Sequence, residues 1–154
     1  MGITKKVIGN TFEQYIVNRM KQLKQQYIRA LVGVGIETVN YIVDRSGEAS
    51  WFDDTGNLRS SIGFVILDEG KIIERYGFKK AKNGAEGVRI GMEFSEIIAS
   101  RVSEFSHGLV LIIVAGMEYA AYVEAMENKD VLASSKFVAK RILEDKIREI
   151  NRGQ

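Results

Sequence analysis

The first third of the chain carries an apolar stripe that is long for one small core to cover. Apolar residues recur every three or four positions from Phe12 to Val34, which predicts an amphipathic helix over residues 10–44. Asn10 and Glu13, three residues apart, fit a capping pair at the start of this helix. A core face or a subunit interface would explain the stripe, and its length of about six turns leaves both interpretations open.

Two glycines interrupt this helix near its end. Gly33 and Gly35 each weaken a helix interior by about 1 kcal/mol relative to alanine. A glycine inside a helical pattern usually has a packing reason. We therefore expect a kink or a close packing contact at this point.

The remainder of the chain predicts a body of mixed α and β structure. A turn signal, Asp68-Glu69-Gly70, separates two runs rich in β-branched and aromatic residues and predicts a β-hairpin. A later helix groups Phe94, Ile97 and Phe105 on one side, and the last helix turns Val131 and Phe137 inward. In order, we expect a loop over 45–57, strands over 58–67 and 71–78, a loop over 79–87, a helix over 91–105, a strand over 109–115, and helices over 118–126 and 131–150.

The most apolar run of the chain extends from Leu109 to Ala115 and is flanked by Gly108 and Gly116. A continuous apolar run of this length is typical of a strand that is buried on both faces. We therefore predict that residues 109–115 form the central strand of the sheet.

Composition places these elements in one folded domain. The chain has 154 residues, of which 45% are hydrophobic and 27% charged, as in proteins with a core. No apolar run approaches the roughly 20 residues that cross a bilayer, so we expect no membrane contact. The predicted class is α+β, with a helical arm over 1–44 and a body over 45–154 in which C-terminal helices pack on a small, mostly antiparallel sheet.

Missing residue types remove much enzyme chemistry. The chain has no cysteine and one histidine, which excludes disulfides, thiol nucleophiles and the cysteine or histidine-pair zinc sites. Asp54-Thr55-Gly56 matches the catalytic triplet of aspartic proteases, but it lies in a polar loop, where a turn explains it better. We expect no catalytic residue, metal or cofactor, and a small hydrolase built on Asp54 is the weaker alternative.

The net charge of +2 conceals a separation of charge along the chain. Residues 1–30 hold six basic and one acidic residue, residues 86–130 hold three and eight, and residues 136–152 hold six and three. The basic helix and the acidic middle can bind each other, within a chain or between copies. Nucleic acid is the alternative partner, although no aromatic residues alternate with the basic ones for base stacking. The basic helix face comprises Arg19, Lys21 and Lys24.

Two short motifs resemble those of a family of small tailed-phage proteins. Asp54-Thr55-Gly56-Asn57-Leu58-Arg59-Ser60-Ser61-Ile62 looks like the "T-G-x-L-R-x-S-I" signature that enters their first strand. Glu118-Tyr119-Ala120-Ala121-Tyr122-Val123-Glu124 resembles their "Y-A-x-Y-V-E" motif, which follows an apolar strand and a glycine. With the order of elements, these motifs make nearly the whole chain similar to the HK97 gene-product-ten-like tail-component or neck protein family.

This resemblance implies a structural, non-enzymatic role in head–tail joining or tail completion of a phage or prophage. It implies a ring of copies in the virion, assembled in the bacterial host cytoplasm, with other neck or tail proteins as partners and DNA touched only indirectly. The chain departs from the family after Glu124, where Ala125 stands in place of a glycine. The implied motif and interface residues are Asp54, Thr55, Gly56, Leu58, Arg59, Ser61, Tyr119, Ala120, Tyr122, Val123 and Glu124.

Elementary geometry adds expectations for these motifs. Gly56 can supply a positive φ, Leu58 can enter the core as the strand begins, and Arg59 is then available for a carboxylate of another copy. Tyr119 and Tyr122 are three residues apart and share one helix face, where they either cover the sheet or meet a partner.

Overall fold

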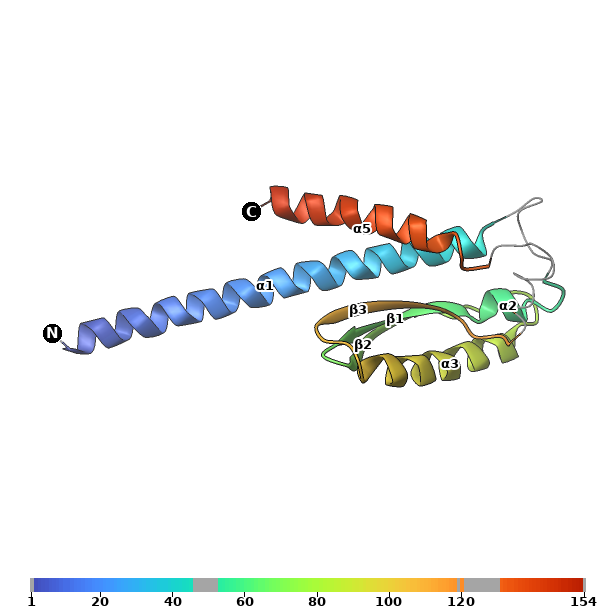
Figure 1. Cartoon of the computed structure of the whole chain (residues 1–154), viewed down its shortest axis with the longest axis horizontal. Coiled ribbons are helices and arrows are strands. Elements are labelled where there is room, and N and C mark those ends of the chain that lie inside the picture. Colours follow the sequence, from blue (N-terminus) through green and yellow to red (C-terminus); the bar gives the residue numbers. More distant parts are fainter. Residues whose placement is uncertain (1, 46–52, 119, 121–130, 154) are drawn as a thin grey trace.

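The longest element is the helix α1, Gly2–Val43, which runs well past the rest of the molecule (Figure 1). The computed structural model describes residues 2–45, 53–118, 120 and 131–153. The helix begins at Gly2, so the predicted capping pair of Asn10 and Glu13 is wrong, because both residues lie inside it. No proline before Asn10 stops the helix, and a capping side chain alone does not end one.

Three antiparallel strands form the sheet, in the order β2-β1-β3. They are β1, Ile62–Asp68, β2, Lys71–Gly77, and β3, Leu109–Ala115. The predicted hairpin is confirmed, and Asp68 pairs with Lys71 beside its turn. The first strand begins at Ile62 instead of Leu58, because Asn57–Ser60 form a short helix, α2. The N–H groups of Ser60 and Ser61 donate to the carbonyl oxygens of Gly56 and Asn57.

The central strand is β1, so the prediction that residues 109–115 form it is wrong. β1 pairs with both neighbours, and its residues from Ile62 to Leu67 are all buried. β3 pairs only with β1 in the described part of the sheet, and only its last two residues are buried. An apolar run indicates a strand, but its place in the sheet depends on pairing and on which elements cover it.

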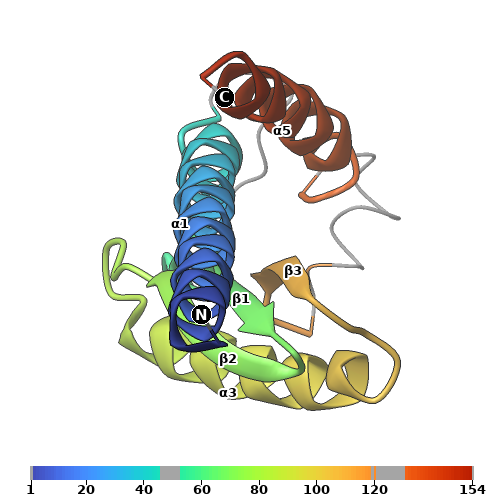
Figure 2. The same cartoon turned by 90° about the vertical axis from the view of Figure 1, so that its left-hand side faces the viewer.

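A helix covers each face of the sheet (Figure 2). Side chains alternate along β1, so one set faces α1 and the other faces α3, Ala85–Ser103. The core under α1 contains Ile62, Phe64 and Ile66 of β1 with Val39 and Ile42 of α1. The smaller core under α3 contains Val65, Leu67 and Ala99.

Small residues allow α3 to lie close to the sheet. The helix begins at Ala85, before the predicted residue 91, and its buried face consists of Gly87, Gly91, Ser95 and Ala99. A Cβ at Gly91 would lie 2.6 Å from the carbonyl oxygen of Ser61. Most of the apolar side predicted for this helix therefore does not face the sheet: Phe94 and Ile97 are exposed, as is Phe105 beyond the end of α3, whereas Val102 packs against the core under α3.

The last helix, α5, Ser135–Arg152, packs along α1. Lys146 Nζ lies 3.0 Å from Glu37 Oε1 across this contact. Val131, just before α5, is buried in the main core as predicted, whereas Phe137, predicted to point inward, is 67% exposed. A helix that packs mainly on one other helix buries a narrow stripe, and Phe137 lies outside it. The α+β class is confirmed, but the last helix, which the sequence predicts on the sheet, packs mainly on α1.

α1 crosses the sheet closely at Gly35. A Cβ there would lie 2.6 Å from the ring of Phe64, which is fully buried and stacks on the ring of Tyr76. Two residues earlier, a Cβ at Gly33 would meet only the flexible end of Lys146, at 2.9 Å. The predicted close packing contact is therefore confirmed, and it depends on Gly35.

The substitution Gly35→Ala is expected to lower the free energy of unfolding by about 1–3 kcal/mol. The added methyl group overpacks against the Phe64 ring, which costs about that much and outweighs a gain of at most about 1 kcal/mol in helix propensity. Urea denaturation followed by circular dichroism measures the change.

Gly33→Ala is the matched control in the same helix. Only the end of a long side chain must shift, so we expect an unchanged or slightly higher free energy of unfolding. Equal losses in the two variants would contradict the assigned crossing point.

Candidate interaction surfaces

Asp53, rather than Asp54, organises the first motif. Asp53 is buried, and its carboxylate accepts hydrogen bonds from the backbone N–H groups of Gly56, at 3.0 Å, and Arg59, at 2.9 Å. Lys82 Nζ donates to the Asp53 carbonyl oxygen at 2.7 Å. Asp54 is exposed. Asp53 precedes the predicted motif, and the sequence signal for its role is an aspartate three residues before a turn glycine.

Gly56 and Ser60 fasten this turn to the loop before α3. Gly56 has a φ of 80°, which confirms the predicted positive φ, and a Cβ there would lie 2.1 Å from the carbonyl oxygen of Ala81. Ser60 Oγ donates to the Gly56 carbonyl oxygen at 2.6 Å and accepts from the Ala81 N–H at 2.8 Å. Both the backbone conformation and the available space therefore require glycine at position 56.

Arg59 makes a contact inside the chain. Its guanidinium donates to the carbonyl oxygen of Val43, the last residue of α1. The last carbonyl groups of a helix lack partners within it and favour a cation. Within the chain, Arg59 thus binds the end of α1, and a carboxylate of another copy as a further partner stays a prediction.

The other described residues of the first motif also bond locally or enter the core. Thr55 Oγ1 accepts from the Asn57 N–H at 3.2 Å, and Ser61 Oγ donates to the Leu58 carbonyl oxygen at 2.8 Å. Leu58 is fully buried, as predicted, although it lies in α2 and not in a strand. The motif therefore forms a joint between α1, β1 and the loop before α3.

Asp53→Ala is expected to lower the free energy of unfolding by about 1–3 kcal/mol, because it leaves the N–H groups of Gly56 and Arg59 without their acceptor. Asp54→Ala is the matched control, with the same charge change at an exposed position, and we expect an effect within about 0.5 kcal/mol. Chemical denaturation of both variants measures the difference, and a larger effect at Asp54 would contradict the assignment.

Most of the second motif lies outside the described residues. This applies to Tyr119, Tyr122, Val123 and Glu124, and to most of the helix predicted over 118–126. Ala120 is described, is half-buried and packs against the main core.

The predicted basic face is divided between solvent and the sheet. Arg19 and Lys21 are exposed, whereas Lys24 Nζ lies 2.7 Å from Asp68 Oδ2 at the end of β1. Lys24 thus joins α1 to the last residue of β1.

Beyond Lys24, α1 exposes apolar side chains. We call residues 11–22 the projecting segment; every residue in it is exposed. Phe12 is 63% and Met20 66% exposed, and Ile16 lies between them at the helical spacing of four. These three residues belong to the same stripe as Val34 and Thr38, which are buried further along α1. The apolar stripe therefore continues past the surface that covers it.

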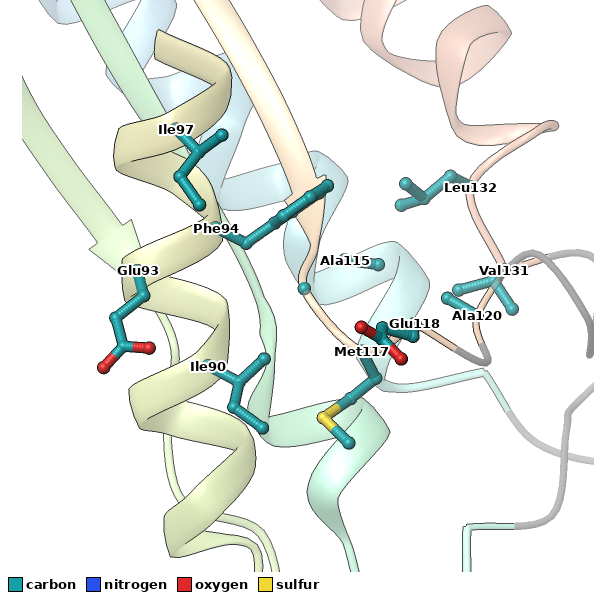
Figure 3. A pocket seen from close by; sticks show the side chains of 11 residues that line it. Ile90, Glu93, Phe94, Ile97, Ala115, Met117, Glu118, Ala120, Val131 and Leu132 are labelled. Carbon is teal, nitrogen blue, oxygen red and sulfur yellow. The ribbon is translucent and has the colours of Figure 1, made fainter. Parts of the chain in front are cut away.

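A groove with an apolar lining lies at the other end of the body, beside α3. It has a volume of about 400 Å³. Figure 3 shows Ile90 and Phe94 of α3 on one side and Val131 and Leu132 on the other, with Met117 between them. Among the described residues, the charged side chains that line this α3 groove are Glu93 and Glu118. Arg89 Nη1 lies 2.8 Å from Glu93 Oε1, and both side chains are exposed, so Glu93 belongs to the rim of the groove.

Two other apolar depressions have basic rims. One lies between β3 and α5 and includes Lys136 and Lys140. The other lies between α1 and β2 and includes Arg59 and Lys79. The charge of the rim therefore distinguishes the α3 groove from both.

No group of three or more histidine, cysteine, aspartate or glutamate residues in the described part of the chain is placed to hold a metal ion. No described helix is both long and apolar enough to span a membrane.

Comparisons with known proteins returned no match: no family model fits the chain, and no curated protein or solved structure is significantly similar to it.

Proposed function

We propose that the chain is a structural, non-enzymatic assembly protein that works by self-association and by contacts with other proteins. The observation that carries this proposal is the exposed apolar stripe of the projecting segment, Phe12, Ile16 and Met20. Contiguous apolar surface on a helix that leaves its own body is typical of an interaction site.

Energetics favour a protein partner for this stripe. Complete burial of one large apolar side chain contributes about 1.5–3 kcal/mol, so three such residues supply several kcal/mol to an interface. A helical segment without tertiary contacts is only marginally stable in water, so a partner that packs on the projecting segment also stabilises its helix.

The setting we propose is the neck or tail-completion region of a phage or prophage particle, with copies arranged in a ring and with neck or tail proteins as further partners. The support is the ordered pair of motifs, from Thr55 to Ile62 and from Tyr119 to Glu124, together with the order of elements: a long helix before the first motif, and a hairpin, a helix and a strand from the first motif to the second. A gene located among portal, capsid and tail genes is the expected finding, and a gene outside any such cluster would contradict this setting.

The arrangement of basic residues favours a protein partner over nucleic acid. Arg19 and Lys21 are two positions apart on α1 and therefore point to different sides of the helix, and Lys24 contacts Asp68. A nucleic-acid backbone is usually bound by a cluster of cations on one surface.

Replacing Ile16 and Met20 by aspartate is expected to weaken self-association at least tenfold. Both side chains are exposed in the single chain, so the double substitution places charges in the interface while the fold is retained. Sedimentation velocity over a concentration series measures association, and circular dichroism measures helicity.

The control is the double variant Asn18→Asp, Gln22→Asp. It adds the same charge at exposed positions on the opposite side of the same helix, so we expect little change in association. If both double variants associate like the unmodified chain, the stripe is not the self-association surface.

A further inference from the structure

We infer that the projecting segment of one copy occupies the α3 groove of the next copy. This inference rests on the proposed self-association and names the two surfaces that meet. The contact is heterologous, since each copy contributes a helix at one end and a groove at the other.

The position of the two surfaces makes the contact intermolecular. The projecting segment extends from one end of the body (Figure 1). The C-terminal end of β3 and the short stretch of chain just before α5 line the groove, and both lie at the opposite end. The rest of α1 packs on the sheet between them and holds the projecting segment away from its own groove. A single copy is therefore unable to bury its own stripe in its own groove.

The two surfaces are complementary in shape and polarity. Phe12, Ile16 and Met20 form a convex row on a helix, and the groove is concave with a lining of Ile90, Phe94, Met117 and other apolar residues. Further along α1, the same stripe already packs on apolar side chains of the sheet. The inferred contact gives the projecting segment the kind of surface that the rest of the helix has.

Charge selects this groove from the three apolar depressions. The projecting segment carries Arg19 and Lys21 against a single acidic residue, Glu13, so it is net positive. Arg19 and Glu13 each lie three residues from Ile16 and border the stripe, so the positive charge favours a partner through the segment as a whole. Among the described residues, the charged lining of the α3 groove is Glu118 and Glu93, the latter paired with Arg89, whereas the charged lining of the other two depressions is basic. Like charges across an interface are unfavourable, so the basic rims are less favourable sites for the projecting segment than the α3 groove.

A contact of this type propagates. A heterologous interface joins each copy to two others and gives a closed ring when the rotation between copies closes, or a filament when it does not. The ring expected for this chain therefore needs only one kind of interface.

Mixing two defective variants tests the inference. The stripe variant is Ile16→Asp, Met20→Asp, which keeps its groove, and the groove variant is Phe94→Asp, Ile97→Asp, which keeps its stripe. We expect each alone to be at least tenfold weaker in self-association than the unmodified chain. An equimolar mixture should form a complex of two chains and stop there, because only one intact stripe and one intact groove meet. Analytical ultracentrifugation measures the mass.

The outcomes separate the two proposals. If the unmodified chain associates and the mixture stays at the mass of single chains, or the groove variant associates normally by itself, the α3 groove is not the partner and self-association stands. If the unmodified chain does not associate at any concentration tested, the proposed self-association fails as well.

Cysteine cross-linking tests the same contact without placing charges in the groove. The natural chain has no cysteine, so Ile16→Cys and Phe94→Cys each introduce a single thiol. In a mixture of the two under mild oxidation, we expect the 16–94 disulfide to exceed the 18–94 disulfide of an Asn18→Cys control at least tenfold, measured by mass spectrometry. Predominant 16–16 disulfides would show that two stripes pair with each other and would overturn the inference.

Discussion

The structure depends on a mismatch of length between α1 and the sheet that it covers. A helix of 42 residues is about 63 Å long, whereas a strand of seven residues spans about 23 Å. One end of α1 crosses β1 closely at Gly35, where only a glycine leaves room for the buried ring of Phe64. With this crossing point set, a long part of the helix has no sheet beneath it. The exposed stripe follows directly from this geometry.

Polar contacts then set the direction in which α1 leaves the body. Lys24 contacts Asp68 at one end of β1, and Arg59 contacts the carbonyl oxygen of Val43 at the other end of the helix. Arg59 of the first motif makes this second attachment, and hydrogen bonds of Asp53 and Ser60 hold the turn at Gly56. A motif that resembles a family signature thus has a structural explanation in this fold, and it orients the helix that we propose as the interaction element.

The small residues of α3 determine where its large ones lie. Because Gly87, Gly91, Ser95 and Ala99 face the sheet, Phe94 and Ile97 are exposed and border a groove whose charged lining, among the described residues, is acidic. The basic projecting segment and the acidic α3 groove therefore lie at opposite ends of the molecule. In this arrangement, the contact that we propose between the basic helix and the acidic groove forms only between different copies.

The sequence by itself determined the element types, because hydrophobic periodicity and turn residues act locally: the long helix, the hairpin, the positive φ of Gly56 and the apolar nature of 109–115 all follow from near neighbours. Only the tertiary structure decided that β1 is the central strand, that Asp53 is buried while Asp54 is exposed, and that Phe94 and Phe137 are not in the core. Strand order and helix faces depend on contacts between distant residues, such as Gly35 with Phe64 and Gly91 with Ser61. For the candidate site, the sequence identified the apolar stripe and the opposite charges, but the packing of α1 and α3 on the sheet placed them at opposite ends.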